Sequence, residues 1–297
     1  MSKMDANTWV AQGKKAGKTR KVLKHELERA MKRAHPADRQ LIAKREMPWP
    51  KLERPGPAYV GLAKKVVDAI EPRSESDPAA LLMTFLAEFG NALGDKVYGR
   101  AESDFHPGRI NVLLVGRTAR ARKGLAQNNT LKVMEEADDH WHQAHQLHAL
   151  STPEGLGRWL THRRKQCTGK PFCSVPMRAM VTIIEFSALL RISSRQGNPL
   201  SEGIRSLWDG GILQVPTKKA PVFINGAHVS IIGHITAEEL TKRITDTDMA
   251  SGFANRFLFS CVERSKKIPN SKPLDLEAIG EEVGEALRKA RDRKAHV

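Results

Sequence analysis

The chain has 297 residues, 40% of them hydrophobic, which is enough for one large or two ordinary domains with a buried core. Lys and Arg number 49 against 33 Asp and Glu, and the formal charge of +16 favours a polyanionic partner such as nucleic acid. Three cysteines do not make a secreted disulfide framework and no apolar run approaches the roughly 20 residues that span a membrane, so we expect a cytoplasmic protein.

Residues 1–57 predict a basic, partly disordered leader or linker. They carry 15 Lys and Arg residues against 6 Asp and Glu residues, and five prolines lie between Pro36 and Pro57. One interpretation is a basic arm that follows nucleic-acid phosphates. The alternative is a solvated leader without a partner.

A helical layer is predicted from residue 58 onward. Apolar residues at helical spacing predict a helix over 59–70. Asp77 and Pro78 then suit the cap and first turn of a second helix, which Gly94 ends. We expect these two helices to cover one side of a sheet.

The next stretch has the frame of a phosphate-binding loop. A buried strand is predicted over 110–116, followed by a loop of small and basic residues and by a helix from about residue 125. Backbone N–H groups and a helix N-terminus would offer partial positive charge to a polyphosphate. The alternative is a basic strand-to-helix turn in another kind of α/β protein.

This loop departs from the strict pattern G-x-x-x-x-G-K-[ST]. Counting from Gly116, the second Gly position holds Ala121 and the Lys position holds Arg122. Either Arg122 binds phosphate, or the loop is one residue longer and Lys123 does so. No hydroxyl follows Lys123, so the magnesium ligand would have to be Thr118 or Thr130.

The helix after the loop is expected to reach about residue 148. It contains a group of acidic residues and histidines, namely Asp138, Asp139, His140, His142, His145 and His148. These lack the i, i+4 pair and third ligand of zinc helices, and the set of His162, Cys167 and Cys173 is no better. We therefore predict a solvated helix face and no metal site.

A further helix is predicted from residue 151, and a stretch that lacks acidic residues begins within it at residue 155. Residues 155–184 contain six Lys or Arg and no Asp or Glu. A basic loop beside a nucleotide site is a candidate nucleic-acid contact. A surface insertion without a partner explains the composition equally well.

The remaining pattern alternates strands with helices. Strands are predicted over 180–184, 228–236 and 257–262, helices over 198–208 and 237–244, and an amphipathic helix near the C-terminus. Such alternation predicts a mostly parallel sheet with helices on both faces. Glu185 ends the strand over 180–184, where it could orient water or hold magnesium, or instead pair with a structural Arg.

Taken in order, these motifs resemble the helicase-like P-loop domain of phage and plasmid replication proteins, which occurs in primase–helicase chains. The resemblance covers roughly residues 58–266. The residues that carry it are Leu114-Val115-Gly116, Arg122-Lys123-Gly124, Glu185-Phe186-Ser187, Gly197-Asn198-Pro199-Leu200-Ser201, Trp208-Asp209-Gly210-Gly211, His228 to Thr236, Asp246-Thr247 and Gly252-Phe253-Ala254-Asn255-Arg256-Phe257. Members show a loop of the form G-x-T-x-x-G-R-K-G-[TS], which favours Lys123 over Arg122.

The resemblance implies an α/β fold with a RecA-like P-loop NTPase core and an N-terminal helical layer. The core would occupy residues 58–268, and residues 269–297 would form the C-terminal amphipathic helix. ATP and Mg²⁺ are implied as cofactors. The residues implied for the nucleotide are Gly116, Thr118, Arg122, Lys123 and Gly124.

Three catalytic roles follow from the same resemblance. Glu185 would orient the attacking water, His234 would sense the γ-phosphate, and Arg256 would act as an arginine finger from a neighbouring subunit. The chain would then be an ATP-hydrolysing, DNA-acting motor or replication accessory of a mobile element. Its implied partners are single-stranded DNA, further copies of itself and a primase.

Three departures from the family pattern support a different interpretation. Ala121 replaces the second Gly and Leu125 replaces the hydroxyl residue, while Ile183 stands where members carry a further acid. The alternative function is therefore a catalytically decayed, non-hydrolysing DNA-binding or regulatory module.

Overall fold

The structure is a computed structural model. It describes residues 56–117, 120–148, 150, 152–166, 177–195, 198–210, 212–215, 222–270 and 272–292. The leader lies outside these ranges, so its assignment stays a prediction. The chain from Lys51 to Val297 forms one compact unit.

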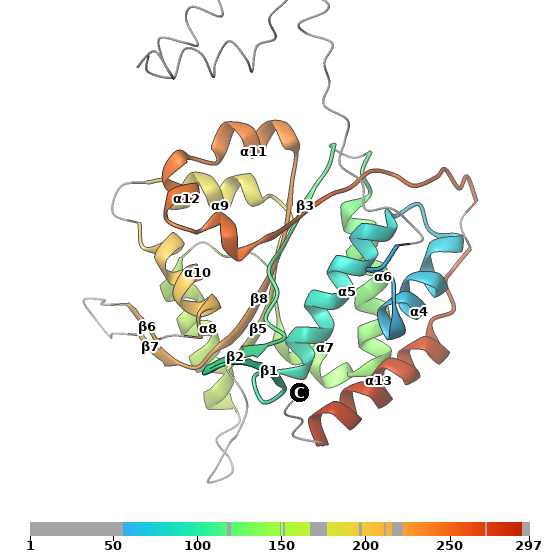
Figure 1. Ribbon diagram of the computed structural model, residues 1–297, viewed down its shortest axis with the longest axis horizontal. Coiled ribbons are helices and arrows are strands. Elements are labelled where there is room, and N and C mark those ends of the chain that lie inside the picture. The colour runs from blue at the N-terminus through green and yellow to red at the C-terminus, as the bar shows by residue number, and fades with distance from the viewer. Residues whose placement is uncertain are drawn as a thin grey trace, which may run out of the picture. The chain divides into compact units, whose positions relative to one another are not determined.

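A sheet of five parallel strands runs through this unit (Figure 1). The strand order is β4-β5-β8-β3-β9, and every neighbouring pair is parallel. The strands are β3 (Val112–Val115), β4 (Gln146–His148), β5 (Arg178–Ile183), β8 (His228–Ile235) and β9 (Leu258–Cys261). Two antiparallel hairpins stand apart from it, β1 (Tyr98–Ala101) with β2 (Asp104–Pro107) and β6 (Ile212–Val215) with β7 (Val222–Asn225).

Helices cover both faces of the sheet, which confirms the predicted α/β class (Figure 1). One layer consists of α4 (Gly61–Ile70), α5 (Pro78–Leu93), α6 (Lys123–Ala137), α7 (Asp139–His145) and α13 (Glu277–Asp292). The other consists of α8 (Pro153–Gln166), α9 (Phe186–Ser193), α10 (Leu200–Trp208), α11 (Ala237–Arg243) and α12 (Asp246–Ala250). None of the described helices is long and apolar enough to cross a membrane.

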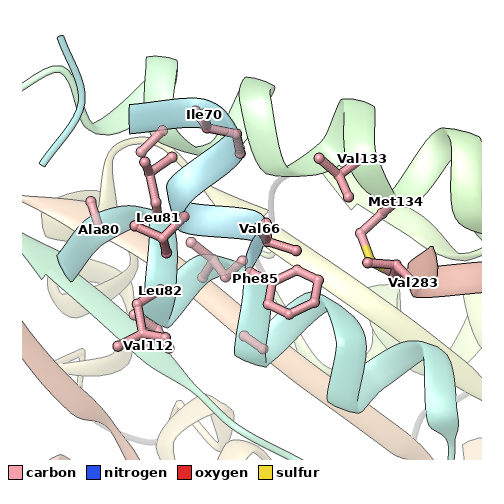
Figure 2. Close-up of a cluster of buried hydrophobic side chains, with 14 of the residues drawn as sticks. Val66, Ile70, Ala80, Leu81, Leu82, Phe85, Val112, Val133, Met134 and Val283 are labelled. Atoms are coloured by element: carbon pink, nitrogen blue, oxygen red, sulfur yellow. The ribbon is translucent and has the colours of Figure 1, made fainter. Parts of the chain in front are cut away.

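The main hydrophobic core lies between the sheet and the layer that contains α5 and α6. Figure 2 shows Phe85 of α5 among side chains from α4, β3, α6 and α13. The C-terminal helix belongs to this core, because Val283 and Leu287 are buried in the same cluster. The helix that carries the candidate phosphate loop is thus fixed on both sides by neighbouring helices.

The prediction that the helix after the loop reaches residue 148 is wrong. It stops at Ala137, and Asp138 begins α7 by accepting a hydrogen bond from the Trp141 amide (2.9 Å). Residues 146–148 then pair with β5 as the edge strand β4. The side chain of Asp138 competes successfully with continued helix, as Asp does at N-caps.

Candidate functional site

The candidate loop begins where two neighbouring strands continue into helices on opposite faces of the sheet. β3 leads to α6 on one face, and its neighbour β8 leads to α11 on the other (Figure 1). The Gly116 amide still donates to the Ile235 carbonyl (3.0 Å), so both strands end at the same level. Ligands of parallel α/β sheets bind outside the carboxyl ends of strands at such a switch point.

Gly116 is required at the start of the loop by close packing. A β-carbon there would lie 2.5 Å from the Ala121 β-carbon and 2.6 Å from the Val262 carbonyl oxygen. Ala121, at the second Gly position of the strict pattern, is itself buried against this glycine. Thr118 lies outside the described residues, and its predicted role stays a prediction.

The backbone at the start of α6 distinguishes between the two lysine registers. Arg122 has φ 51° and ψ 29°, a left-handed conformation that suits Gly and is uncommon for other residues. In the strict pattern a Gly immediately precedes the phosphate lysine. Arg122 therefore occupies the conformation expected of that Gly, which favours Lys123 as the phosphate lysine.

Lys123 is held over the loop without a counter-ion. Its ammonium group donates to the Gly116 carbonyl (2.7 Å), and it makes no ion pair with any of the described residues. Burial lowers the pKa of Lys123, although the charges of Glu239 and Glu238 act in the opposite direction. A half-buried cation whose hydrogen bonds within the described residues go to carbonyl oxygens would be stabilised by an anion in the loop.

Arg122 is engaged elsewhere, and Gly124 is open. The Arg122 Nε donates to the Glu75 carboxylate (2.7 Å). A β-carbon at Gly124 would meet nothing within 4 Å, so packing does not demand a glycine there. Of the predicted nucleotide ligands, Gly116 and Lys123 come together while Arg122 binds a different element.

His234 lies on the α6 side of β8, next to the loop. Ile232, two residues earlier on the same face, belongs to the core that contains α5 and α6. His234 is 4% exposed, and its Nε2 has no hydrogen-bond partner among the described residues. Burial, and secondly the charge of Lys123, lowers its pKa to about 4, so the imidazole is neutral at neutral pH.

Thr130 is excluded as the magnesium hydroxyl. It is fully buried two turns into α6, and its hydroxyl contacts the Ala126 (3.3 Å) and Gln127 (3.1 Å) carbonyls. Leu125, in the first turn, offers no oxygen. The chain therefore provides no hydroxyl ligand on the described part of α6 near the loop.

Two polar contacts near the loop were not predicted from the sequence. The Gln127 amide of α6 donates to the Thr182 hydroxyl of β5 (2.6 Å) and so ties the helix to the sheet. Ser187 donates to Glu239 (3.0 Å), and that carboxylate acts electrostatically on Lys123. Thr236 and Glu239 form a capping box at the start of α11, a signal visible in the sequence as T-x-x-E.

Glu185 lies at the expected edge of the sheet. It is exposed, directly precedes α9 and follows β5 by two residues. Because β8 separates β5 from β3, the two strand ends are two strand spacings, about 10 Å, apart. Glu185 could face a ligand that extends from the loop, but it contacts neither Lys123 nor Arg122 in any hydrogen bond of the described chain.

Arg256 lies at the opposite edge of the sheet. It ends the short helix η2 (Ala254–Arg256) before β9, and the Leu258 amide bonds to the Asn111 carbonyl at the start of β3 (2.9 Å). Its guanidinium donates to both carboxylate oxygens of Asp209, each at 3.2 Å. Within one chain Arg256 is therefore remote from the loop, and the finger role would require a second copy.

The stretch without acidic residues also reaches that opposite edge. β5 begins at Arg178, which pairs with His228 at the start of β8. Arg178 therefore lies at the amino edge of the sheet, whereas the loop at Gly116 lies at the carboxyl edge. Residues 167–176 of this stretch lie outside the described ranges, so the basic loop and its nucleic-acid contact stay predictions.

One of the histidines after α6 makes a structural contact. His145 is buried with its Nδ1 3.2 Å from the Arg178 carbonyl, and burial lowers its pKa to about 4. Across the described ranges, no group of three His, Cys, Asp or Glu residues could hold a metal ion. Cys167 and Cys173 lie outside those ranges.

No protein-family model and no curated protein matches this chain.

Proposed function

We propose that the chain is an ATP-binding, ATP-hydrolysing protein with a RecA-like P-loop core that acts on DNA in the replication of a mobile element. The observation that carries the proposal is Lys123, a half-buried ammonium group that makes no ion pair with any described residue and lies at the switch point of a parallel sheet. The strand order is consistent with a RecA-like core without being specific to it. The helicase-like role depends on the sequence resemblance.

Each residue of the loop region would have a defined role in this function. Lys123, the loop amides and the N-terminus of α6 would bind the β- and γ-phosphates. His234, which is neutral and whose Nε2 has no hydrogen-bond partner in the described part of the chain, would contact the γ-phosphate through that atom. Glu185 would orient the attacking water from the end of β5.

The site suits a triphosphate better than it suits magnesium. Around the loop the chain offers the carboxylates of Glu185 and Glu239 as Mg²⁺ ligands, with no hydroxyl in the first turn of α6. Mg²⁺, when bound, would neutralise charge on the phosphates. The lack of a hydroxyl is the observation that favours the second candidate, a non-hydrolysing nucleotide-dependent DNA-binding module.

The proposal includes partners as well as a ligand. Single-stranded DNA would bind through the basic charge of the chain, and a primase would act with it in replication. A homo-oligomer is part of the proposal because Arg256 could approach the loop only from a neighbouring copy. These assignments depend on the family resemblance and on charge.

Equilibrium binding of a fluorescent ATP analogue tests the proposed site. Lys123→Ala should lose binding by at least about tenfold, because the charge that neutralises the phosphates is removed from a desolvated position. Lys242→Ala is the matched control, since Lys242 is an exposed lysine of α11. It should bind as the wild type does.

Turnover separates the two candidate functions once binding is established. Hydrolysis that Glu185→Gln lowers without a comparable loss of affinity supports the ATPase. Binding without hydrolysis, with and without single-stranded DNA, supports the decayed module. Equal affinities of the wild type and Lys123→Ala for the ATP analogue would show that the loop is not the nucleotide site.

A further inference from the structure

The turn between α4 and α5 connects two segments that flank the candidate loop. This turn comprises residues 71–77 and begins with the short helix η1 (Glu71–Arg73). Toward α6, Ser74 accepts a hydrogen bond from the Asn129 amide (3.0 Å). Toward the segment after β9, Asp77 accepts from the Glu263 amide (2.8 Å) and Glu71 pairs with Lys266 (2.8 Å).

Glu75 is the residue of this turn that contacts both sides at once. One carboxylate oxygen lies 2.7 Å from the Arg122 Nε and 3.6 Å from the Arg264 Nε. The other accepts from the Ile268 amide (2.9 Å). The hydrogen bond from the Ile268 amide lowers the pKa of the Glu75 carboxyl most, and the guanidinium of Arg122 lowers it further. Both oxygens of Glu75 are therefore engaged as an ionised carboxylate.

Arg122 has a backbone conformation that its own chemistry does not favour. A residue with a β-carbon is disfavoured in the left-handed region by steric crowding, and it stays there only when its surroundings impose it. Arg122 is one of two described non-glycine residues with positive φ, and its guanidinium is bound to Glu75. Asn129, seven residues later on the same face of α6, is bound to Ser74 of the same turn.

We infer that Glu75 is a positioning residue that holds Arg122 in the left-handed conformation and thereby directs Lys123 into the loop. The ion pair would do for Arg122 what the absence of a β-carbon does for Gly in the strict pattern. This inference rests on the proposed function, because Lys123 matters only if the loop binds a polyphosphate. Glu75 itself would not touch the nucleotide.

Replacing Arg122 with Gly separates this role from a general structural one. Arg122→Gly removes the ion pair and also the strain, whereas Arg122→Ala removes the ion pair and keeps the β-carbon. Glu75→Gln is nearly isosteric and still accepts from the Ile268 amide. The set comprises the wild type, Glu75→Gln, Arg122→Ala, Arg122→Gly and the double variant Glu75→Gln/Arg122→Gly.

The affinity for a fluorescent ATP analogue should follow the backbone preference at residue 122. Glu75→Gln and Arg122→Ala should each bind roughly tenfold more weakly, the factor that corresponds to the cost of the left-handed conformation. Arg122→Gly and the double variant should bind within about threefold of the wild type, because Gly needs no support there. Restoration of binding by a second substitution is a result that simple damage to the fold does not produce.

Three outcomes would overturn the inference. Unchanged or tighter binding by Glu75→Gln would mean that its carboxylate acts only as a negative charge near the phosphates. Weak binding by Arg122→Gly, as weak as by Arg122→Ala, would mean that the guanidinium itself contacts the nucleotide. Weak binding by the double variant alone would mean that Glu75 acts through Arg264 or Ile268.

A nucleotide-free measurement keeps the inference separate from the proposed function. Without ligand, Arg122→Gly should melt at a higher temperature than Arg122→Ala, and Glu75→Gln should lower the melting temperature less in the Gly background. If the wild type does not bind the analogue, the proposed function fails while this comparison still tests the contact. Equal melting temperatures of the Gly and Ala variants would refute the positioning role.

Discussion

At the scale of single residues, Glu88 of α5 has an unfavourable environment for its charge. It is fully buried, and neither carboxylate oxygen accepts a hydrogen bond from any of the described residues. The hydroxyl of Thr130 lies beside it but has carbonyl partners for its single proton. Burial raises the pKa of Glu88 well above its ordinary value of 4.5, so the neutral acid is the form that fits.

Glu88→Gln should therefore gain stability over the wild type as the pH rises. Because the folded pKa is raised, the folded protein keeps a proton that the unfolded chain releases above about 4.5. The stabilisation from protonated Glu88 is complete below that pH and is lost as the pH rises through the folded pKa. Urea unfolding at pH 5, 6.5 and 8 should show the variant gaining up to about 1.4 kcal/mol per pH unit. A difference that stays constant over this range would contradict the neutral assignment.

The residues of the loop illustrate what a sequence can reveal at this scale. Lys123 and His234 were predicted because each has a position defined by a strand end. Glu75 was not predicted, because its contact with Arg122 joins residues 47 positions apart and leaves no local pattern. Thr130 was a wrong candidate, since the sequence shows its hydroxyl but not that the helix buries it.

Among the elements, α6 is held in place largely by α13. Two glycines of α13 allow the close approach: a β-carbon at Gly280 would lie 2.3 Å from the Glu136 β-carbon, and one at Gly284 would lie 2.8 Å from the Ala137 carbonyl oxygen. Arg291 adds an ion pair with Asp138 (2.7 Å) at the end of α6. The C-terminal helix thus supports the helix that begins at Lys123.

Gly284→Val should loosen this helix pair. The contact at 2.8 Å is with backbone, so the helices must separate, and we expect a loss of about 1–3 kcal/mol in the free energy of unfolding. Glu281→Val, on the exposed side of α13, is the matched control. This control should lose less free energy of unfolding, even though Glu281→Val lowers the helix propensity of its position whereas Gly284→Val raises it. Equal losses in denaturant unfolding would show that the helix contact contributes little.

Long elements with a strong pattern could be predicted, whereas short ones depended on tertiary contacts. The helix α5, with Asp77 as its cap and Gly94 at its end, was predicted almost residue by residue. The strand β4 was not, because three residues, two of them polar, are too short to show a periodicity and become a strand only by pairing with β5. The hairpins β1–β2 and β6–β7 were missed for the same reason.

At the scale of the whole molecule, positive charge and the candidate site occupy different parts of the sequence. Residues 1–50 contain 13 Lys and Arg and 5 Asp and Glu, so half of the formal charge of +16 lies outside the compact unit that begins at Lys51. Within that unit, α8 contacts β6 and β7, and β7 carries the 60% exposed Phe223. Under the proposed function, this exposed ring offers a surface on which bases of single-stranded DNA can stack.

The intact protein should bind single-stranded DNA with a steep dependence on salt and little dependence on sequence. If about five phosphates are contacted, the logarithm of the binding constant should fall against the logarithm of salt concentration with a slope of roughly −3.5, since each neutralised phosphate of a single strand contributes about −0.7. Deleting residues 1–50 removes half of the net charge at the boundary of the compact unit, so the slope should become clearly shallower while binding of an ATP analogue stays as in the intact protein. Fluorescence anisotropy of a labelled oligonucleotide across a salt series measures both slopes. A truncated protein with an unchanged slope would place the DNA contacts within Lys51–Val297, and a flat slope in the intact protein would leave the charge without a nucleic-acid partner.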